Sequence, residues 1–586
     1  MRNLIIIFFL LFPSIVLSQS ADKNSNAKYW IIFKDKGSYK PNIVISPGSD
    51  AEKECSKIIT DRAVKRRKKV LPTGRVFDYM DLPIFEGYIK KIENEKIEII
   101  AKSRWLNGVS AQLSGEQIQK LKKLGIISYF RIVDKMIPSK TENELLEEYI
   151  ESKSDSVKYK FDYGNSLKQM EMVNVPLLHK MGFSGNGIMI TSLDDGFDWK
   201  NHEALKNLNI SIEYDFVNKD GNTAPEENQK FKDIPSQGGH GTATLSSMSG
   251  FMPGKLIGPA FGSEILLAKS EYVPTETPME EDFWLEACEW AEALGTDIIT
   301  SSLIYRNYDK EFSTNTYKYE MLDGDIPIAS FAGDRCTYLG VAVFQAMGNY
   351  NQTSEPSLGS SADGDSIISV GAVMYNGLPA TFTSNGPNSK GQIKPDISAP
   401  GVGVFVARIN TNYDGKSLYE YSNGTSFSTP IAAGIAALIL EAHPELTPMQ
   451  LRDALRLTGS QSTRPDNILG WGIVNGYQAA LFHGMIFSPY PELTLENGGL
   501  KVSTYIASNV PIDLSSVILQ YNDDGTSWLK DVKMELTDEV FDNNGSGRYE
   551  CFIEGVNDLK FFSYYISAKD VNGKLGEYIE KKKIKY

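Results

Sequence analysis

The chain has 586 residues, of which 60 are Lys or Arg and 74 are Asp or Glu, so its formal net charge is −14. This acidic balance excludes a general electrostatic footprint for nucleic acid or for an anionic membrane surface. The length exceeds what one ordinary core accommodates and predicts about two to four domains. We interpret one basic run, residues 64–70 (VKRRKKV), as a solvated helix face or a linker.

The first 18 residues have the features of a secretory signal. One basic residue precedes an apolar core at residues 4–12, and the small residues Val16 and Ser18 follow it. This pattern predicts cleavage after Ser18 and a secreted or cell-surface protein. An uncleaved membrane anchor is the alternative, but the apolar core is too short to span a membrane comfortably. We predict no membrane span after signal removal, since the apolar run at residues 431–440 is short.

Cysteine and metal-ligand patterns are sparse in this chain. The four cysteines do not predict a disulfide framework; they are Cys55, Cys288, Cys336 and Cys551. No C-x-x-C or H-E-x-x-H motif occurs, and residues 218–222 (NKDGN) do not fit an EF-hand loop. We therefore assign no metal and no required cofactor.

Residues 19–135 are predicted to form a small α/β domain. Residues 27–37 and 97–113 are rich in strand formers, and residues 126–134 (IISYFRIVD) predict a further strand. Before that last strand comes a predicted helix, with Ser114 and Gln117 as a capping box and Gly125 as its stop. Residues 136–162 are charged and poor in turn signals, which predicts a linker.

The pattern changes at Tyr163, where buried-strand candidates begin to alternate with helical stretches such as residues 280–294. Such alternation predicts an α/β domain over residues 163–487, with a parallel sheet covered by helices on both faces. Residues 488–586 have short alternating strands divided by turn sequences, which predicts a β-sandwich. We interpret Tyr564 and Tyr565 there as strand core rather than ligand contacts.

Residues 423–440 (NGTSFSTPIAAGIAALIL) place four hydroxyl side chains before an apolar run. Because proline is tolerated in a first helical turn, a helix is expected to begin near Pro430, with Ser426 at or just before its N-terminus. The unpaired N–H groups and positive dipole end there can stabilise developing negative charge. Ser426 is thus a candidate nucleophile, and the alternative is an N-cap cluster in front of a core helix.

A serine nucleophile needs a base, and the base needs an orienting group. Of five histidines, His240 is the one between glycines, in SQGGHGTATLSS; the others have helical or loop surroundings. A carboxylate at a strand end is offered by GIMITSLDDGFD, where the apolar strand ends at Asp194 and Asp195 begins the turn. Asp195 competes with Asp194 for the role of orienting group. The alternative for the aspartate motif is an ordinary turn aspartate, and the alternative for the histidine motif is an ordinary loop histidine.

Three motifs in the order Asp194, His240 and Ser426 resemble those of the subtilisin-like serine proteases, the subtilases. LDDGFD is similar to the family's aspartate motif, GGHGT to its histidine motif and NGTSFSTPIAAG to its serine motif. The segment AMGN resembles the family's oxyanion segment, and HPELTPMQLRDAL resembles the helix behind the serine. The resemblance covers about residues 163–482.

The resemblance implies a catalytic triad in which Ser426 attacks the scissile carbonyl, His240 transfers the proton and Asp194 orients the imidazole. It further implies that Asn349 donates to the oxyanion. Substrate-binding candidates carried over from the family are Ser302, Leu303, Ala346 and Gly348. Polypeptides are the implied substrates, and calcium, which the family often binds, is not required for catalysis and has no ligands assignable here.

The N-terminal α/β domain also resembles a subtilase propeptide, through residues 103–134. The resemblance implies that this domain assists folding and then inhibits the protease as an intramolecular partner. Maturation cleavage is expected within residues 136–162. For the C-terminal domain, family parallels imply an accessory role in binding, attachment or stabilisation.

Two departures from the family pattern bear on function. Asp195 replaces the usual Ser or Thr, a change that removes no catalytic group. Ile304 in SSLIY replaces a glycine of the substrate-binding strand and is expected to narrow the path for an extended substrate. The principal reading is a secreted subtilisin-like endopeptidase made as an inactive zymogen. The alternative is a catalytically silent relative that binds peptides or a surface partner, while an esterase lacks support because no G-x-S-x-G elbow surrounds Ser426.

Overall fold

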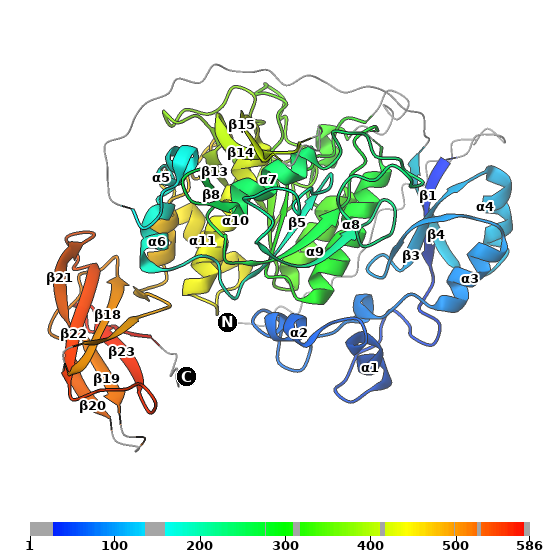
Figure 1. Cartoon of the computed structure of the whole chain (residues 1–586). Coiled ribbons are helices and arrows are strands. Elements are labelled where there is room, and N and C mark those ends of the chain that lie inside the picture. The colour runs from blue at the N-terminus through cyan, green and yellow to red at the C-terminus, as the bar shows by residue number, and fades with distance from the viewer. Residues whose placement is uncertain are drawn as a thin grey trace.

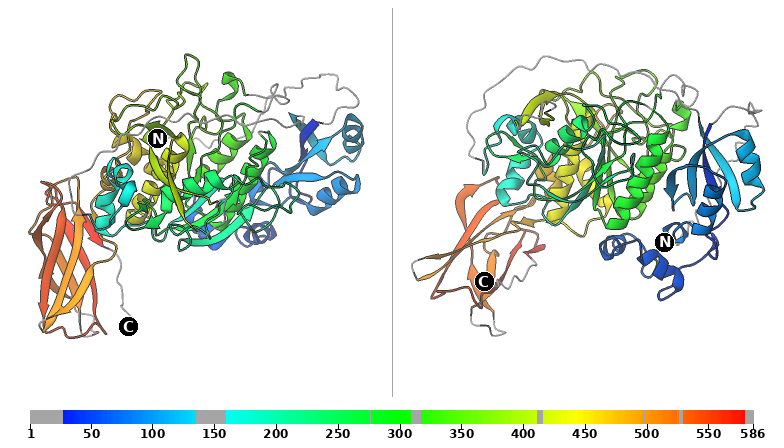
Figure 2. Two further views of the ribbon diagram at one scale, coloured as in Figure 1. Left: turned by 45° about the horizontal axis from the view of Figure 1, so that its top comes forward. Right: turned by 45° about the vertical axis from the view of Figure 1, so that its right-hand side comes forward.

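A computed structural model describes residues 27–134, 159–275, 277–308, 317–410, 416–496, 498–523, 525 and 529–578. The predicted signal sequence and most of the predicted linker lie outside these residues. The described chain forms a small N-terminal domain, a large central α/β domain and a C-terminal β-sandwich. The two smaller domains lie at opposite ends of the central one (Figure 1), as two further views also show (Figure 2).

The N-terminal domain is built on a four-stranded antiparallel sheet in the order β2-β3-β1-β4. Its strands are β1 (Ala27–Phe33), β2 (Ile99–Ser103), β3 (Gly108–Leu113) and β4 (Ile127–Asp134). Helices α3 (Glu86–Asn94) and α4 (Gly115–Lys122) provide Ile92 and Leu121 to the core beneath this sheet. The predicted capping box is confirmed, since Ser114 and Gln117 each bond the other's backbone N–H.

The central domain contains a seven-stranded parallel sheet, as predicted, in the order β13-β12-β11-β10-β5-β9-β6. The strands are β5 (Met189–Asp194), β6 (Asn209–Asp215), β9 (Glu264–Lys269), β10 (Ile298–Ser301), β11 (Ala342–Ala346), β12 (Ile368–Val373) and β13 (Ile397–Pro400). Adjacent residues of one strand point into separate cores: Ile298 packs in one and Ile299 in the other. Both faces of the sheet are therefore buried, which explains the nearly continuous apolar strands.

Helices cover each face of this sheet. On one side lie α7 (Gly239–Ser249) and α10 (Thr425–Ala442), with α11 (Pro448–Leu457) and α12 (Gly476–Leu481) beyond them. On the other side α8 (Met279–Leu294) packs against α9 (Ile328–Tyr338). Among the described helices, α10 alone is long and apolar enough to cross a membrane, and 89% of it is buried inside the fold.

The N-terminal domain packs on α8, and buried ion pairs join the two (Figure 1). Helix α2 (Asp61–Arg67) carries the first part of the basic run. The interpretation as a solvated face or linker holds for the exposed Lys65, Lys68 and Lys69 but is wrong for the two arginines. Arg66 and Arg67 are 3% and 0% exposed, and both bind the carboxylate of Glu292 on α8. The partner carboxylate is 225 residues from Arg67 in sequence, so the local pattern could not reveal it.

The C-terminal domain consists of two antiparallel sheets that enclose a separate apolar core. One sheet holds β16 (Ile486–Phe487), β17 (Glu492–Glu496), β18 (Gly499–Ala507), β21 (Glu535–Val540) and β22 (Gly547–Glu554). The other holds β19 (Ile518–Asn522), β20 (Lys530–Lys533), β23 (Ser563–Lys569) and β24 (Leu575–Tyr578). Tyr564 lies in the core between them, as predicted, whereas Tyr565, predicted to be core as well, is only half-buried and lies outside this core. All four cysteines of the chain are buried free thiols.

Candidate active site

The candidate residues gather where the carboxyl ends of β5, β10 and β11 meet the N-termini of α7 and α10. Asp194 is the last residue of β5, and Asn349 lies three residues after β11. His240 is the second residue of α7 and Ser426 the second of α10, and these two helices pack against each other. Parallel strands deliver their C-terminal residues to one edge of a sheet, which is where α/β folds place their sites.

Asp194 and His240 form a direct hydrogen bond. His240 Nδ1 lies 2.6 Å from Asp194 Oδ1, which also accepts from the Asp195 backbone N–H at 2.8 Å. The second oxygen, Oδ2, accepts from Thr244 Oγ1 at 2.9 Å. Asp194 is 1% exposed, whereas the His240 side chain is 32% exposed. A buried carboxylate thus holds an imidazole whose other nitrogen, Nε2, remains available for proton transfer.

The environment of His240 favours its charged form. Desolvation alone would lower the pKa of His240, but the charge and hydrogen bond of Asp194 outweigh it and raise that pKa above the ordinary value of 6.5. The neighbouring carboxyl of Asp195 adds to the same effect. The site therefore stabilises an imidazolium, which is the species that forms when this histidine accepts a proton.

Ser426 lies in the first turn of α10, which begins at Thr425, five residues before Pro430. The expectation that Ser426 lies at the helix N-terminus is confirmed to within one residue, whereas Pro430 is the sixth helical residue and lies beyond the first turn in which it was expected. Pro430 has no N–H to donate to the Ser426 carbonyl four residues earlier. That carbonyl instead accepts from Ser302 Oγ at 2.8 Å. The ring of Phe427, next to Ser426, lies 6.2 Å from the His240 ring, which places the histidine beside this helix start.

The side chain of Asn349 is fixed by Thr425. Its Oδ1 accepts from the Thr425 backbone N–H and from Thr425 Oγ1, both at 3.0 Å. Two donors on one oxygen fix the amide orientation, so that Nδ2 is the group left to donate, with no acceptor among the described residues. Asn349 is exposed, and Gly348 before it has a φ of +102°, which glycine adopts without strain.

The four predicted substrate-binding residues lie along β10 and β11 and just beyond them. Ser302 contacts the carbonyl of Ser426, and the Leu303 carbonyl accepts from Gln345 Nε2. Leu303 and Ala346 are 5% and 0% exposed, so their side chains lie below the surface. Ile304 is partly exposed, and its Cγ2 would lie 2.3 Å from a Cβ added to Gly359. Ile304 thus packs directly on the backbone of the facing segment.

No individual role is assigned to Thr244 or Thr425 from the sequence, yet these residues support Asp194 and Asn349. A signal for Thr244 was present, since it follows His240 by four residues and so lies on the same helix face. Thr425 directly precedes the predicted nucleophile. Asp195, considered as a rival orienting group, contacts the backbone of α7 rather than the imidazole nitrogen that Asp194 binds.

Asp194, Asp195 and His240 place ligand atoms within 4.8 Å of one another, a spacing that would also suit a metal ion. However, both oxygens of Asp194 and the Nδ1 of His240 already share hydrogen bonds within the protein. This arrangement is typical of a carboxylate that orients a histidine base.

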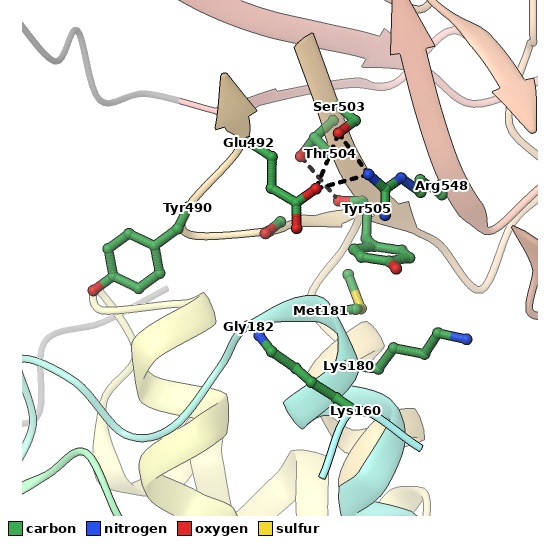
Figure 3. Close-up of a pocket in the computed structure, with 11 residues that line it drawn as sticks. Lys160, Lys180, Met181, Gly182, Tyr490, Glu492, Ser503, Thr504, Tyr505 and Arg548 are labelled. Atoms are coloured by element: carbon green, nitrogen blue, oxygen red, sulfur yellow. Dashed lines mark hydrogen bonds and ion pairs between the residues drawn. The ribbon is translucent and has the colours of Figure 1, made fainter. Parts of the chain in front are cut away.

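Two cavities lie away from this site. One, of about 60 Å³, lies between α6 (Val175–Met181) and the C-terminal domain (Figure 3). Three of its charged groups are paired: Arg548 binds Glu492 at 2.7 Å, and Lys180 binds Glu539 at 2.6 Å. The other, of about 280 Å³, is lined by Lys394, Arg452, Arg456 and Trp471, with Lys394 and Arg456 paired to Asp396. Neither contains a predicted site residue.

Comparisons with known proteins agree with this geometry. Residues 185–472 match the Subtilase family, and residues 28–147 match the Peptidase S8 propeptide domain of Bacteroidota. Subtilisin E of Bacillus subtilis is 26% identical over 394 residues, covering 67% of this chain and 85% of the relative. Serine protease AprX of the same species is 26% identical over 438 residues, covering 70% and 93%. The crystal structure of fervidolysin from Fervidobacterium pennivorans, described as a keratinolytic enzyme related to subtilisin, has the same fold, with a TM-score of 0.52. Its sequence is 17% identical, and the match covers 93% of this chain and 70% of fervidolysin.

Proposed function

We propose that this chain, which belongs to the subtilase family of serine proteases through residues 185–472, is a secreted endopeptidase that acts through an acyl-enzyme on Ser426. The observation that carries the proposal is the buried Asp194 bound to His240 Nδ1 at 2.6 Å, at the start of a helix that packs against the helix of Ser426. A carboxylate, an imidazole and a serine at a helix N-terminus can divide proton transfer and nucleophilic attack among them.

In the proposed reaction, Ser426 Oγ attacks the carbonyl carbon of the scissile peptide bond and His240 Nε2 takes the hydroxyl proton. Asp194 holds the tautomer in which Nδ1 carries a hydrogen and stabilises the imidazolium that forms. The charged oxygen is stabilised by Asn349 Nδ2 and the Ser426 backbone N–H, and one such donor is worth about 10²- to 10³-fold in rate. His240 then gives its proton to the leaving amine. Water, activated by the same histidine, hydrolyses the acyl-enzyme.

The N-terminal domain is proposed to inhibit the enzyme until it is removed. Its sheet and helix α2 pack on α8 through buried ion pairs, so the two domains associate through an extensive surface within one chain. Cleavage within residues 136–162 would convert this domain from a covalent part of the chain to a dissociable inhibitor. The signal sequence is proposed to export the precursor.

Labelling with a serine-directed fluorophosphonate tests this proposal. The probe is applied to the purified secreted chain, and mass spectrometry identifies the labelled peptide and the new N-terminus. We expect label on Ser426, and an N-terminus within residues 136–162. Ser426→Ala should abolish both labelling and maturation, while the secreted precursor should begin at Gln19.

Ser428→Ala is the matched control, since Ser428 lies in the same helix turn and its hydroxyl bonds the Pro400 carbonyl rather than a site residue. This variant should label like the wild type. A folded chain freed of its N-terminal domain that takes no label would contradict the proposal and favour the catalytically silent, peptide-binding alternative.

A further inference from the structure

Asp195 is a second buried carboxyl beside the proposed triad, and its contacts differ from those of Asp194. It is 3% exposed, and its Oδ1 accepts from the Gly241 backbone N–H at 2.8 Å. Gly241 is in the first turn of α7, where Gly238 occupies the N-cap position and offers no side chain to cap the helix. Asp195 therefore supplies, from the neighbouring turn, the acceptor that helix N-termini require.

The capped turn is the one that carries His240. Two adjacent carboxyls at the end of β5 thus bind this histidine in different ways: Asp194 binds the imidazole, and Asp195 binds the backbone next to it. The backbone of Gly241 packs closely against the turn after β5, because a Cβ on Gly241 would lie 2.1 Å from the Gly196 carbonyl oxygen. The turn itself is fixed by Gln237 Nε2, which donates to the carbonyls of Asp195 and Glu271.

The charged groups around His240 come from the ends of two strands. Asp194 and Asp195 follow from β5, and Glu271 lies two residues after β9. Lys269, at the end of β9, is neutralised by Asp215 at 2.9 Å and Asp233 at 2.8 Å. Burial, with the charge of Asp194, raises the pKa of Asp195 to about 7. This is below the value of about 10 to which the pKa of His240 is raised, so Asp195 carries its negative charge where His240 loses its proton.

We infer that Asp195 is a positioning residue for His240, which acts through the first turn of α7 and, by its negative charge, sets the pH range in which His240 works as a base. The inference rests on the proposed function for its catalytic consequence. A negative charge near the imidazolium stabilises the protonated histidine, so removal of that charge should let His240 lose its proton at a lower pH.

Two substitutions separate the charge from the hydrogen bond. Asp195→Asn removes the charge and keeps an oxygen that can accept from Gly241, whereas Asp195→Ala removes both. In Asp195→Asn, the acidic limb of the kcat/KM profile should move to lower pH by about one unit, as expected for a close charge. Asp195→Ala should show the same movement and, in addition, a plateau lowered by about 10- to 100-fold through misplacement of His240.

The titration of His240 can also be read without catalysis, by NMR of the imidazole nitrogens in the full chain carrying Ser426→Ala. Asp195→Asn in that background should lower the midpoint of His240 by about one pH unit. Asp198→Asn removes a partly exposed carboxylate of the same turn that binds Asn201, and should leave the midpoint unchanged. An unchanged midpoint in Asp195→Asn, in a chain that melts like its parent, would overturn the inference. An unlabelled wild-type Ser426 would instead count against the proposed function, and the NMR titration would still decide the role of Asp195.

Discussion

The carbonyl oxygen of Ser426 lacks the usual helical donor four residues further on, because Pro430 at that position has no N–H. Ser302 Oγ takes that place at 2.8 Å. We expect Ser302→Ala to lower the free energy of unfolding by about 1–3 kcal/mol, since it leaves a buried carbonyl unsatisfied. Pro430→Ala restores an N–H at the required position, so Ser302→Ala should cost about 1 kcal/mol less in that background. Urea unfolding of full-length chains carrying Ser426→Ala measures both values.

Ser428→Ala is the control for this pair, because the Ser428 hydroxyl bonds Pro400 and not the carbonyl that Pro430 leaves free. Its effect should add to that of Pro430→Ala without coupling. Equal costs of Ser302→Ala in the two Pro430 backgrounds would mean that the serine hydroxyl does not replace the missing helix donor.

Individual residues differ in how far the sequence can predict their place. Asp194 and His240 were identified as candidates from a strand end and a glycine-flanked histidine, and the structure joins them by a hydrogen bond. The start of α10 beside Ser426 is predicted correctly, but Pro430 lies beyond the first turn in which a proline is expected. The contact that permits Pro430 inside the helix comes from Ser302, 124 residues from Ser426, which no local rule includes.

At the scale of elements, the segment after β10 forms a wall beside Ser426. Ser302 contacts Ser426, and Tyr305 pairs with Ser360 through hydrogen bonds of 2.9 and 3.0 Å. Between them, Ile304 packs on Gly359. We expect this wall to restrict the substrate side chain next to the scissile carbonyl. Ile304→Gly should raise the kcat/KM ratio of Phe over Ala peptides at least about tenfold, as measured on matched peptide substrates.

Gly359→Ala tests the same contact from the opposite side. Its Cβ would meet Ile304 Cγ2 at 2.3 Å, so it should destabilise the wild type and be tolerated in the Ile304→Gly chain. Ile299→Val is the control, since Ile299 packs in the core beneath α8 and α9. The substrate ratio should not change there. The same ratio in Ile304→Gly and wild type would show that this wall does not select the substrate.

The elements with strong periodicity are predicted correctly, because the patterns that specify them lie within short stretches of the sequence. The parallel sheet follows from apolar strands buried on both faces, and the capping box of α4 from two residues three positions apart. The burial of the two arginines in the basic run at residues 64–70 is not predicted from the sequence, because their environment is not local. Arg67 is 0% exposed only because Glu292 and Asp81 surround it.

At the scale of the whole molecule, Glu292 connects the N-terminal domain to the catalytic domain. Its carboxylate binds Arg67 through bonds of 2.7 and 2.8 Å, contacts Arg66, and lies 3.3 Å from Arg104. Burial would raise the pKa of Glu292, but Arg67 and Arg66 outweigh it and lower that pKa to about 2. The ionised carboxylate of Glu292 therefore stabilises the association at pH values above 4.5, the ordinary pKa of a glutamate. This contribution is lost as the pH falls toward 2.

Glu292→Gln is therefore expected to weaken the hold of the N-terminal domain on the catalytic domain. The amide leaves Arg66 and Arg67 buried with one carboxylate fewer, and breaking such a pair costs about 3–5 kcal/mol, or on the order of 10²-fold or more in affinity. After maturation, the N-terminal fragment should separate from the variant on size exclusion at neutral pH, and proteolytic activity should appear earlier than in the wild type. Glu54→Gln is the control and should behave as the wild type. Glu54 lies on α1 (Asp50–Ser56), and the substitution removes only its ion pair with Lys57 near the surface. If the fragment of Glu292→Gln stays bound as firmly as the wild-type fragment, the apolar contacts of the interface, and not this buried ion cluster, hold the inhibitor in place.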